Sequence, residues 1–278
     1  MEPEESPVSL TYSNYLRVNE LIQLQTMKSV DPDHDKGPEH DEMLFIVIHQ
    51  VYELWFKQIL HELDHMMVLF AEFTPSHDTT PKIRAALKRV LTIFKTLVAQ
   101  VDILETMTPI SFASFREFLD QASGFQSFQF RELEFLLGQR DHRMLRFHMD
   151  NPEAYERLDR RLGQPSLYQG FLHYLSLNGY TIPEKALAPL GDAPPPEFEE
   201  VREVLIDIYR NDDRIALVCE RLVDLDEGLQ EWRYRHVKMV ERTIGTKRGT
   251  GGSPGVDFLR QTLFKPVFPD LWTIRADL

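Results

Sequence analysis

The strongest constraint on the fold of this 278-residue chain is a four-three spacing of apolar residues that persists over long stretches. One stretch covers residues 82–106, and its apolar positions are Ile83, Leu87, Val90, Phe94, Leu97, Val101 and Leu104. A second covers residues 214–244, with Ile215, Val218, Leu222, Leu225, Leu229, Trp232, His236 and Met239. This spacing keeps apolar side chains on one helix face and is typical of helical bundles and coiled coils. Residues 41–72, which follow a cluster of acidic residues, predict a third long helix.

No convincing strand pattern interrupts this periodicity, so the sequence predicts an all-α fold. Shorter helices are expected at residues 13–28, 111–120, 127–138, 152–162, 166–178 and 197–210. Five prolines mark residues 183–196 as a loop, and the apolar pattern resumes after it. We therefore expect one helical-bundle domain over residues 1–278, in which residues 1–9 form a mobile tail.

Composition excludes several classes of protein. The net charge of −13 argues against a nucleic-acid-binding surface or an anionic-membrane surface. No apolar stretch reaches the ~18 residues that a membrane span needs, and the acidic N-terminus lacks the apolar core of a signal peptide. The single cysteine, Cys219, excludes an internal disulfide framework and fits a reducing, cytoplasmic setting.

A glycine-dense loop follows the last long helix, in the segment EWRYRHVKMVERTIGTKRGTGGSPG at residues 231–255. It lacks the Gly-Lys-Ser/Thr of a Walker A loop. It is not a GxGxxG turn either, because Pro254 stands where the third glycine should be and no strand precedes it. Glycine clusters where the backbone adopts positive φ or approaches another group closely. The loop is therefore interpreted either as a ligand lid or as an ordinary long turn.

Two histidines lie on apolar helix faces. His236 is in register with Trp232 and Met239, and His49 shares a face with the aromatic residues Phe45, Tyr52 and Phe56. Each is interpreted either as a core histidine with one hydrogen bond or as a functional group, His236 as a metal ligand. Cationic residues around His236 would suit an anionic cofactor or pair with acidic neighbours; they are Arg233, Arg235, Lys238, Arg242, Lys247 and Arg248.

Two further motifs have both structural and functional interpretations. Arg116 stands among phenylalanines, where its guanidinium would pair with a carboxylate of the protein or of a substrate. The sequence HExxH, the signature of a zinc hydrolase, occurs at His61, Glu62 and His65. The charged Asp64 inside it and the absence of a close third ligand favour surface histidines instead.

Four blocks together resemble the tryptophan 2,3-dioxygenase family. They are LTYSNYL (10–16), EHDEMLFIVIHQVYELWFKQ (39–58), FREFLDQASGFQSFQFRELEFLLG (115–138) and WRYRHVKMVERTIGTKRGTGGSPG (232–255). The resemblance implies an all-α, cytoplasmic homotetramer that binds b-type haem with ferrous iron. It also implies that O₂ is inserted across the indole C2–C3 bond of L-tryptophan to give N-formylkynurenine.

By matching position, the resemblance implies a role for individual residues. His236 would be the axial ligand of the haem iron, His49 the group that hydrogen-bonds the indole N–H, and Arg116 the clamp on the substrate carboxylate. Thr250 would meet the substrate's amino end. The resemblance further implies pocket walls, a turn over the haem face, and an N-terminal segment that reaches a neighbouring subunit; these are Phe45 and Phe112, Ser123 and Gly124, and Tyr12 and Tyr15.

The chain departs from the family pattern at Pro254, where the family usually has serine, and at Val51, where a small or polar residue is commoner. Three alternatives to tryptophan dioxygenation stay open. One is oxidation of a substituted tryptophan to an oxindole-type product, with one oxygen inserted. The others are the zinc hydrolase of His61, Glu62 and His65, and a helical interaction protein without chemistry.

Overall fold

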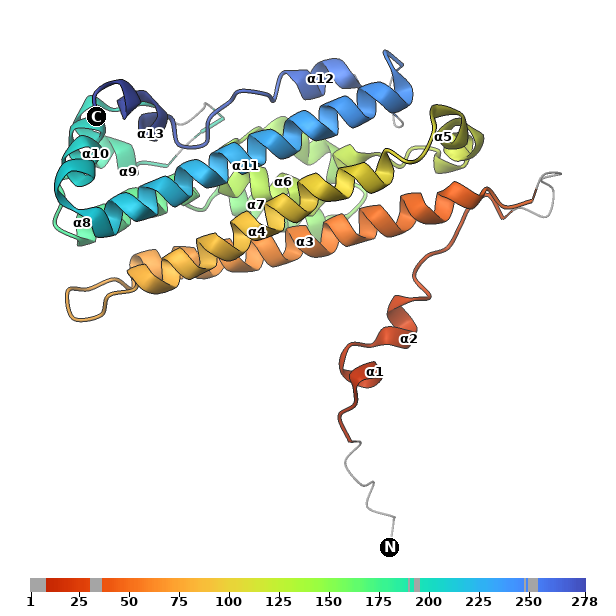
Figure 1. The fold of residues 1–278 in the computed structure, drawn as a ribbon, viewed down its shortest axis with the longest axis horizontal. Helices are drawn as coiled ribbons and strands as arrows, with labels where there is room; N and C mark the ends of the chain where they lie inside the picture. The colour runs from red at the N-terminus through yellow and green to blue at the C-terminus, as the bar shows by residue number, and fades with distance from the viewer. Residues whose placement is uncertain (1–8, 31–36, 190, 193–195, 248, 250–254) are drawn as a thin grey trace, which may run out of the picture.

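Three long helices run along the molecule in the computed structural model, which describes residues 9–30, 37–189, 191–192, 196–247, 249 and 255–278 (Figure 1). They are α3 (His40–Ala71), α4 (Thr80–Leu104) and α11 (Asp213–Ile244). Helix α4 packs against both α3 and α11. The three long helices predicted from the apolar spacing are therefore confirmed, with ends that differ by one or two residues.

The predicted apolar face of α4 forms the centre of this packing. All seven of its predicted positions are buried, from Ile83 at 0% exposure to Leu104 at 8%. Burying a side chain of this size stabilises the fold by roughly 1.5–3 kcal/mol relative to leaving it in water. Pro81 stands in the first turn of α4, where its missing N–H costs nothing. The four-three spacing thus accounts for both the length of α4 and its place between two other helices.

Shorter helices cover the bundle. Helix α6 (Phe128–Leu136) and helix α8 (Leu167–Leu177) pack on α3, α7 (Pro152–Leu162) packs on α6, and α10 (Glu199–Asn211) packs on α11. Gly170 allows α8 to approach α3 closely, because a Cβ atom there would lie 2.6 Å from the sulfur of Met67. The described residues contain no strand beyond an isolated bridge between Thr74 and His77, so the all-α prediction is confirmed.

No helix among the described residues is both long and apolar enough to cross a membrane. The predicted loop at 183–196 contains a single-turn helix, α9 (Glu184–Leu187), while its residues 190 and 193–195 lie outside the described ranges. Residues 1–8 of the predicted tail also lie outside them.

The N-terminal arm, residues 9–30, extends away from the bundle (Figure 1). The helix predicted at 13–28 is wrong, because the arm contains two single-turn helices, α1 (Tyr12–Tyr15) and α2 (Val18–Leu21). Between them Arg17 adopts a left-handed φ of 51°, which interrupts helical hydrogen bonding. No residue of α1 or α2 is buried, so these two helices lack the tertiary packing that stabilises most helices.

Polar contacts fix the root of the arm to α3. The Glu42 carboxylate, buried in the first turn of α3, accepts hydrogen bonds from the backbone N–H groups of Lys28 and Ser29 at 2.7 and 2.9 Å. Farther along α3, the side chain of Gln50 accepts a hydrogen bond from the Gln25 amide at 2.5 Å and donates one to the Leu24 carbonyl at 3.1 Å. The direction in which the arm leaves the bundle is therefore set by α3.

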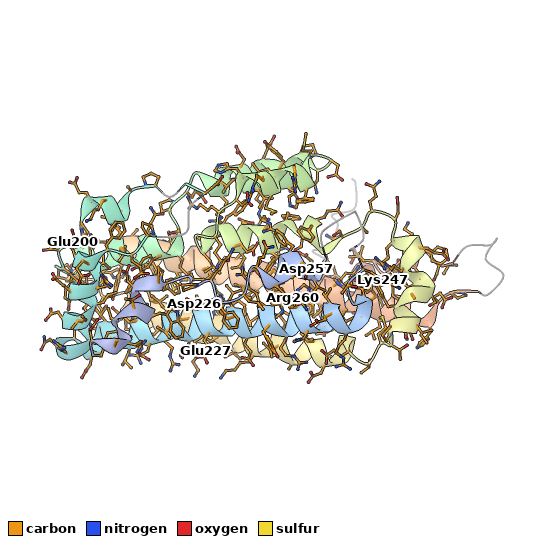
Figure 2. All side chains as sticks on the ribbon, turned by 90° about the horizontal axis from the view of Figure 1, so that it is seen from above. Glu200, Asp226, Glu227, Lys247, Asp257 and Arg260 are labelled. Carbon is orange, nitrogen blue, oxygen red and sulfur yellow. The ribbon has the colours of Figure 1, made fainter. Side chains whose placement is uncertain are left out.

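The C-terminal segment folds back along α11 as α12 (Val256–Arg260), α13 (Pro269–Thr273) and the 3₁₀ turn η5 (Ile274–Ala276). Asp226, labelled on α11 in Figure 2, ties this segment down. Its carboxylate accepts hydrogen bonds from the backbone N–H groups of Val267 and Phe268 at 2.7 and 3.2 Å, and from the indole N–H of Trp272 at 2.9 Å. Asp226 is 1% exposed, so these three donors share an acceptor that water cannot replace.

Replacing this acceptor should destabilise the protein. We expect Asp226→Ala to lower the free energy of unfolding by about 2–4 kcal/mol, because two backbone N–H groups and one indole N–H lose their partner. The exposed neighbour Glu227, also labelled in Figure 2, provides the control, and Glu227→Ala should change the value by less than about 0.5 kcal/mol. Urea denaturation measures both, and equal losses in the two variants would contradict the role assigned to Asp226.

Candidate functional site

A mainly apolar cavity opens between α3, α6 and α11. Its rim includes α5 (Pro109–Phe115), the 3₁₀ turns η1 (Arg116–Leu119) and η2 (Gly124–Gln126), and α12. The lining contains most of the residues singled out in the sequence: Phe45, His49, Phe112, Arg116, Ser123, Gly124 and His236. Segments more than 180 residues apart in the chain therefore meet at one site, and the bundle brings them together.

His236 reaches the cavity from α11. Its imidazole stacks on the indole of Trp232, one turn earlier, with ring centroids 5.2 Å apart and planes 5° from parallel. Desolvation and, to a smaller extent, the nearby His49 lower the pKa of His236 to about 4. The ring is therefore neutral at physiological pH. A neutral imidazole is the form that binds a metal.

His49 reaches the same cavity from α3. Its Nδ1 lies 2.6 Å from the carbonyl oxygen of Phe45. Because a carbonyl can only accept, Nδ1 donates and Nε2 of the neutral ring is left as an acceptor. Desolvation lowers the pKa of His49 and outweighs the opposing effects of the Phe45 carbonyl and the Glu53 carboxylate. His49 thus offers the cavity a hydrogen-bond acceptor without a charge.

An aromatic cluster forms the apolar wall beside His49. The rings of Phe45 and Phe112 lie 5.7 Å apart, and both contact Phe115, which is fully buried. Phe45 also lies 4.2 Å from the His49 ring. Arg116 follows Phe115 at the end of α5, so the helix end delivers a guanidinium to the edge of this wall. An apolar wall with one cationic group suits a ligand with a flat ring and a carboxylate.

Ser123 and Gly124 form the start of η2. The Ser123 hydroxyl caps the turn, and the Gln126 side-chain oxygen accepts a hydrogen bond from the Ser123 backbone N–H, which completes a capping box. Both residues line the cavity. The reciprocal cap fixes this turn although it contains only three residues.

Comparison with known proteins agrees with this arrangement. A family model described as "Tryptophan 2,3-dioxygenase" matches residues 2–175 and 200–278. The chain belongs to the tryptophan 2,3-dioxygenase family. A tryptophan 2,3-dioxygenase from Herpetosiphon aurantiacus is 53% identical over 270 residues, which cover 97% of this chain and 99% of that protein. Proteins of the same name from Anaeromyxobacter sp. (strain K) and Caulobacter vibrioides are 51% and 42% identical, and their matches cover 97% or more of each chain.

The family resemblance inferred from the sequence is thereby confirmed. Thr250 and Pro254, which the resemblance places in the loop that closes on substrate, lie outside the described residues. The described glycines on either side, Gly249 and Gly255, line the cavity. Val51 lies in α3 and is half-buried. The roles of Thr250, Pro254 and Val51 in this member of the family stay predictions.

Tyr12 and Tyr15 do not line the cavity of their own chain. They lie in α1 on the N-terminal arm and are 76% and 69% exposed. The arm also exposes Leu10, Ile22 and Leu24 by more than half, which is a large apolar surface for so short a segment. Their predicted contact with a neighbouring subunit in this tryptophan 2,3-dioxygenase family member stays a prediction.

The HExxH motif does not form a metal site. His61 and His65 are exposed on α3, whereas the Glu62 carboxylate is buried and bonded to Arg89 at 2.8 Å. Asp64 pairs with Arg161, also at 2.8 Å. No group of three or more His, Cys, Asp or Glu side chains in the described part of the chain could hold a metal ion. The zinc hydrolase alternative is wrong, because the glutamate that would act as base is an ion-pair partner between helices.

A buried charge network on the cavity wall escaped the sequence analysis. Glu134 on α6 pairs with Arg131 and, at 2.7 Å, with Arg233 on α11. Arg233 also donates to the Thr262 carbonyl at 3.0 Å. Two arginines and one glutamate leave one positive charge on the wall, and the Nε atom of Arg131 is buried without a partner in the described residues. The spacing of Arg131 and Glu134 was visible in the sequence, but Arg233 is 99 residues away.

A second missed contact joins α3 to α6 beside His49. The Gln129 amide donates to both the backbone carbonyl and the carboxylate of Glu53, at 2.9 and 2.8 Å. Glu53 follows His49 by one turn and also lines the cavity. In the sequence, the only indication that Glu53 belongs to the site is its position one helical turn after His49.

The surface position of the HExxH histidines yields a test. The double variant with His61→Ala and His65→Ala should retain the metal content and turnover of the unaltered protein, because neither ring reaches the cavity. Elemental analysis and a turnover assay check this. Loss of a stoichiometric metal from the double variant would restore the zinc hydrolase interpretation.

Proposed function

We propose that this protein catalyses the insertion of O₂ across the indole C2–C3 bond of L-tryptophan, giving N-formylkynurenine. The observation that carries the proposal is the pair of neutral imidazoles, His49 and His236, which face one apolar cavity from α3 and α11. The names of the relatives favour the same reaction. Both oxygen atoms of O₂ enter the product, so the reaction needs no external reductant. The relatives' names do not favour the oxindole alternative.

The cavity fits haem b as the cofactor. We propose that His236 would hold the haem iron, because its lowered pKa keeps a lone pair available for a metal. The surplus positive charge of Arg131, Glu134 and Arg233 would balance carboxylates such as those of haem, and the unpartnered Nε of Arg131 is a donor for one of them. Ser123 and Gly124 would border the haem face. When bound, the haem would supply the ferrous iron that activates O₂.

We further propose that three groups orient the substrate. Arg116 would hold the carboxylate, and Nε2 of His49 would accept the indole N–H. The rings of Phe45 and Phe112 would contact the indole and exclude water. Thr250 would meet the ammonium group. Fixing both ends of the amino acid restricts how its ring can lie, which places the C2–C3 bond for reaction.

The assembly proposed for the protein is a homotetramer. The exposed apolar surface of the arm supports it, because a partner would bury Tyr12 and Tyr15. In that arrangement these tyrosines complete the cavity of a neighbouring subunit. A cytoplasmic location stays a prediction.

The ligand role of His236 can be tested by spectroscopy. Purified protein should show a strong Soret band. His236→Ala should lose most of it, because the variant lacks the imidazole that would hold the iron in the cavity. His173→Ala, which removes an exposed histidine on α8, should keep the band. A colourless unaltered protein would end the haem proposal, and normal haem content in His236→Ala would remove His236 from the iron.

The clamp role of Arg116 predicts a substrate-affinity effect. Arg116→Ala should raise the KM for L-tryptophan at least tenfold, because a charge-assisted bidentate pair contributes more than about 1.4 kcal/mol. Arg116→Lys should give an intermediate value, since lysine keeps the charge but not the two parallel donors. Steady-state kinetics measures both. A KM that is unchanged in Arg116→Ala would exclude the clamp.

The pKa of His49 predicts the pH dependence. Protonation turns Nε2 from an acceptor into a donor, so kcat/KM should fall as the pH drops through the pKa of His49. Desolvation places that pKa below 6.5, even with Glu53 on the same helix raising it, so the acid limb should lie below pH 6.5. His49→Ser should be slower and lack this limb. An acid limb at or above pH 6.5 that His49→Ser retains would rule out His49 as its source.

A further inference from the structure

A second cavity of about 310 Å³ adjoins the first. It lies between the segment around η2 and the end of the 3₁₀ helix η3 (His142–His148), and we name it the outer cavity. Ser123 and Phe125 line both cavities, so the turn that contains them borders each one. The proposed reaction uses no other residue of the outer cavity. Its volume is within the range of small-molecule sites, which begins at roughly 300 Å³.

Two opposite charges line the outer cavity. Arg146 and Asp150 are four residues apart, and both are exposed. The neighbouring exposed Arg143 is paired with Asp141 at 2.9 Å. Arg146 instead lies over the ring of Phe147, 4.7 Å from its centroid, and forms no ion pair within the described ranges. The guanidinium keeps its donors for another group.

Asp150 likewise lacks a counter-charge among the described residues. The nearest histidine, His148, does not supply one. Burial and the positive charge of Arg131 lower the pKa of His148, and they outweigh the opposing effect of Asp150. His148 is therefore neutral at physiological pH, and the Asp150 carboxylate remains open to a cation.

Apolar groups lie beside this charge pair. The rings of Phe125 and Phe147 lie 5.4 Å apart, and Phe125 also contacts Phe258 of α12 at 5.0 Å. Met149 is 74% exposed at the same cavity. Aromatic faces and a thioether are favourable contacts for a flat ring. The outer cavity thus combines a carboxylate-binding group, an ammonium-binding group and a surface for a ring.

We propose that the outer cavity is a second binding site, for the zwitterion of an aromatic α-amino acid. Arg146 binds the carboxylate, Asp150 binds the ammonium group, and Phe125, Phe147 and Met149 contact the ring. The proposed function supplies two such amino acids, the substrate tryptophan and the product N-formylkynurenine, and the inference rests on it for their identity. The shared turn at Ser123 and Phe125 places the bound molecule directly outside the reaction cavity.

The test is equilibrium dialysis of the haem-loaded protein with labelled L-tryptophan, without O₂ so that no turnover occurs. We expect two binding sites per chain. Arg146→Ala and Asp150→Asn should each weaken the outer site at least threefold and leave the inner site unchanged. Arg146→Lys should retain part of the binding. Arg160→Ala, which removes an exposed arginine of α7, should leave both sites unchanged.

Ligand analogues test the zwitterion requirement. Tryptamine lacks the carboxylate and indole-3-propionate lacks the ammonium group, so each should compete for the outer site more weakly than tryptophan. Competition by N-formylkynurenine shows which amino acid the site prefers. Tighter binding of either one supports the proposal. Equal competition by all the analogues would identify an unspecific aromatic surface and overturn it.

The design separates this inference from the proposed function. Arg116→Ala should weaken only the inner site. If it changes nothing, the proposed function fails at the clamp, while the outer site is still tested by Arg146→Ala. A single site in the unaltered protein that is insensitive to Arg146→Ala and Asp150→Asn would overturn the outer site alone. Equal weakening by Arg160→Ala would show that the effect is only one of overall charge.

Discussion

The packing of α4 between α3 and α11 is the constraint on which the rest of the structure depends. It fixes the rotation of the two outer helices, and a helix turned by one residue moves each side chain about 100° around its axis. His49 on α3 and His236 on α11 reach one cavity only while both rotations hold. The Tyr52 hydroxyl reinforces the arrangement by donating to the Leu97 carbonyl of α4 at 2.7 Å. The positions of the two imidazoles therefore depend on the buried face of α4.

The electrostatics of the cavity follow from two different uses of burial. At the histidines, desolvation is the largest effect, and it lowers the pKa of both imidazoles so that the rings are neutral at physiological pH. At the Arg131, Glu134 and Arg233 network, each charge has an opposite charge beside it, which offsets part of the cost of removing these groups from water. A chain with a net charge of −13 therefore presents a cationic wall at one place in its interior. Such a wall suits a ligand that carries carboxylates.

The features that the sequence could predict are those that depend on local periodicity. The seam of α4, from Ile83 to Leu104, follows from spacing alone, and the cavity residues followed from matching blocks to a family. The arm could not be predicted, because its apolar residues lack an intramolecular partner and Arg17 interrupts the helix. The ion pair of Glu62 with Arg89 and that of Glu134 with Arg233 join different helices, so no local pattern indicates them.

Gln50 stands next to His49 on α3 and holds the root of the arm through Leu24 and Gln25. Adjacent positions of one helix turn together, so the imidazole and the anchor share a single rotation. Evolution therefore cannot adjust them separately: a change that redirected the arm by turning α3 would also displace His49 from the cavity. A change in the direction of the arm that leaves His49 in place must therefore arise beyond the anchor, in the stretch that contains α1 and α2. A change there would not alter the rotation of α3.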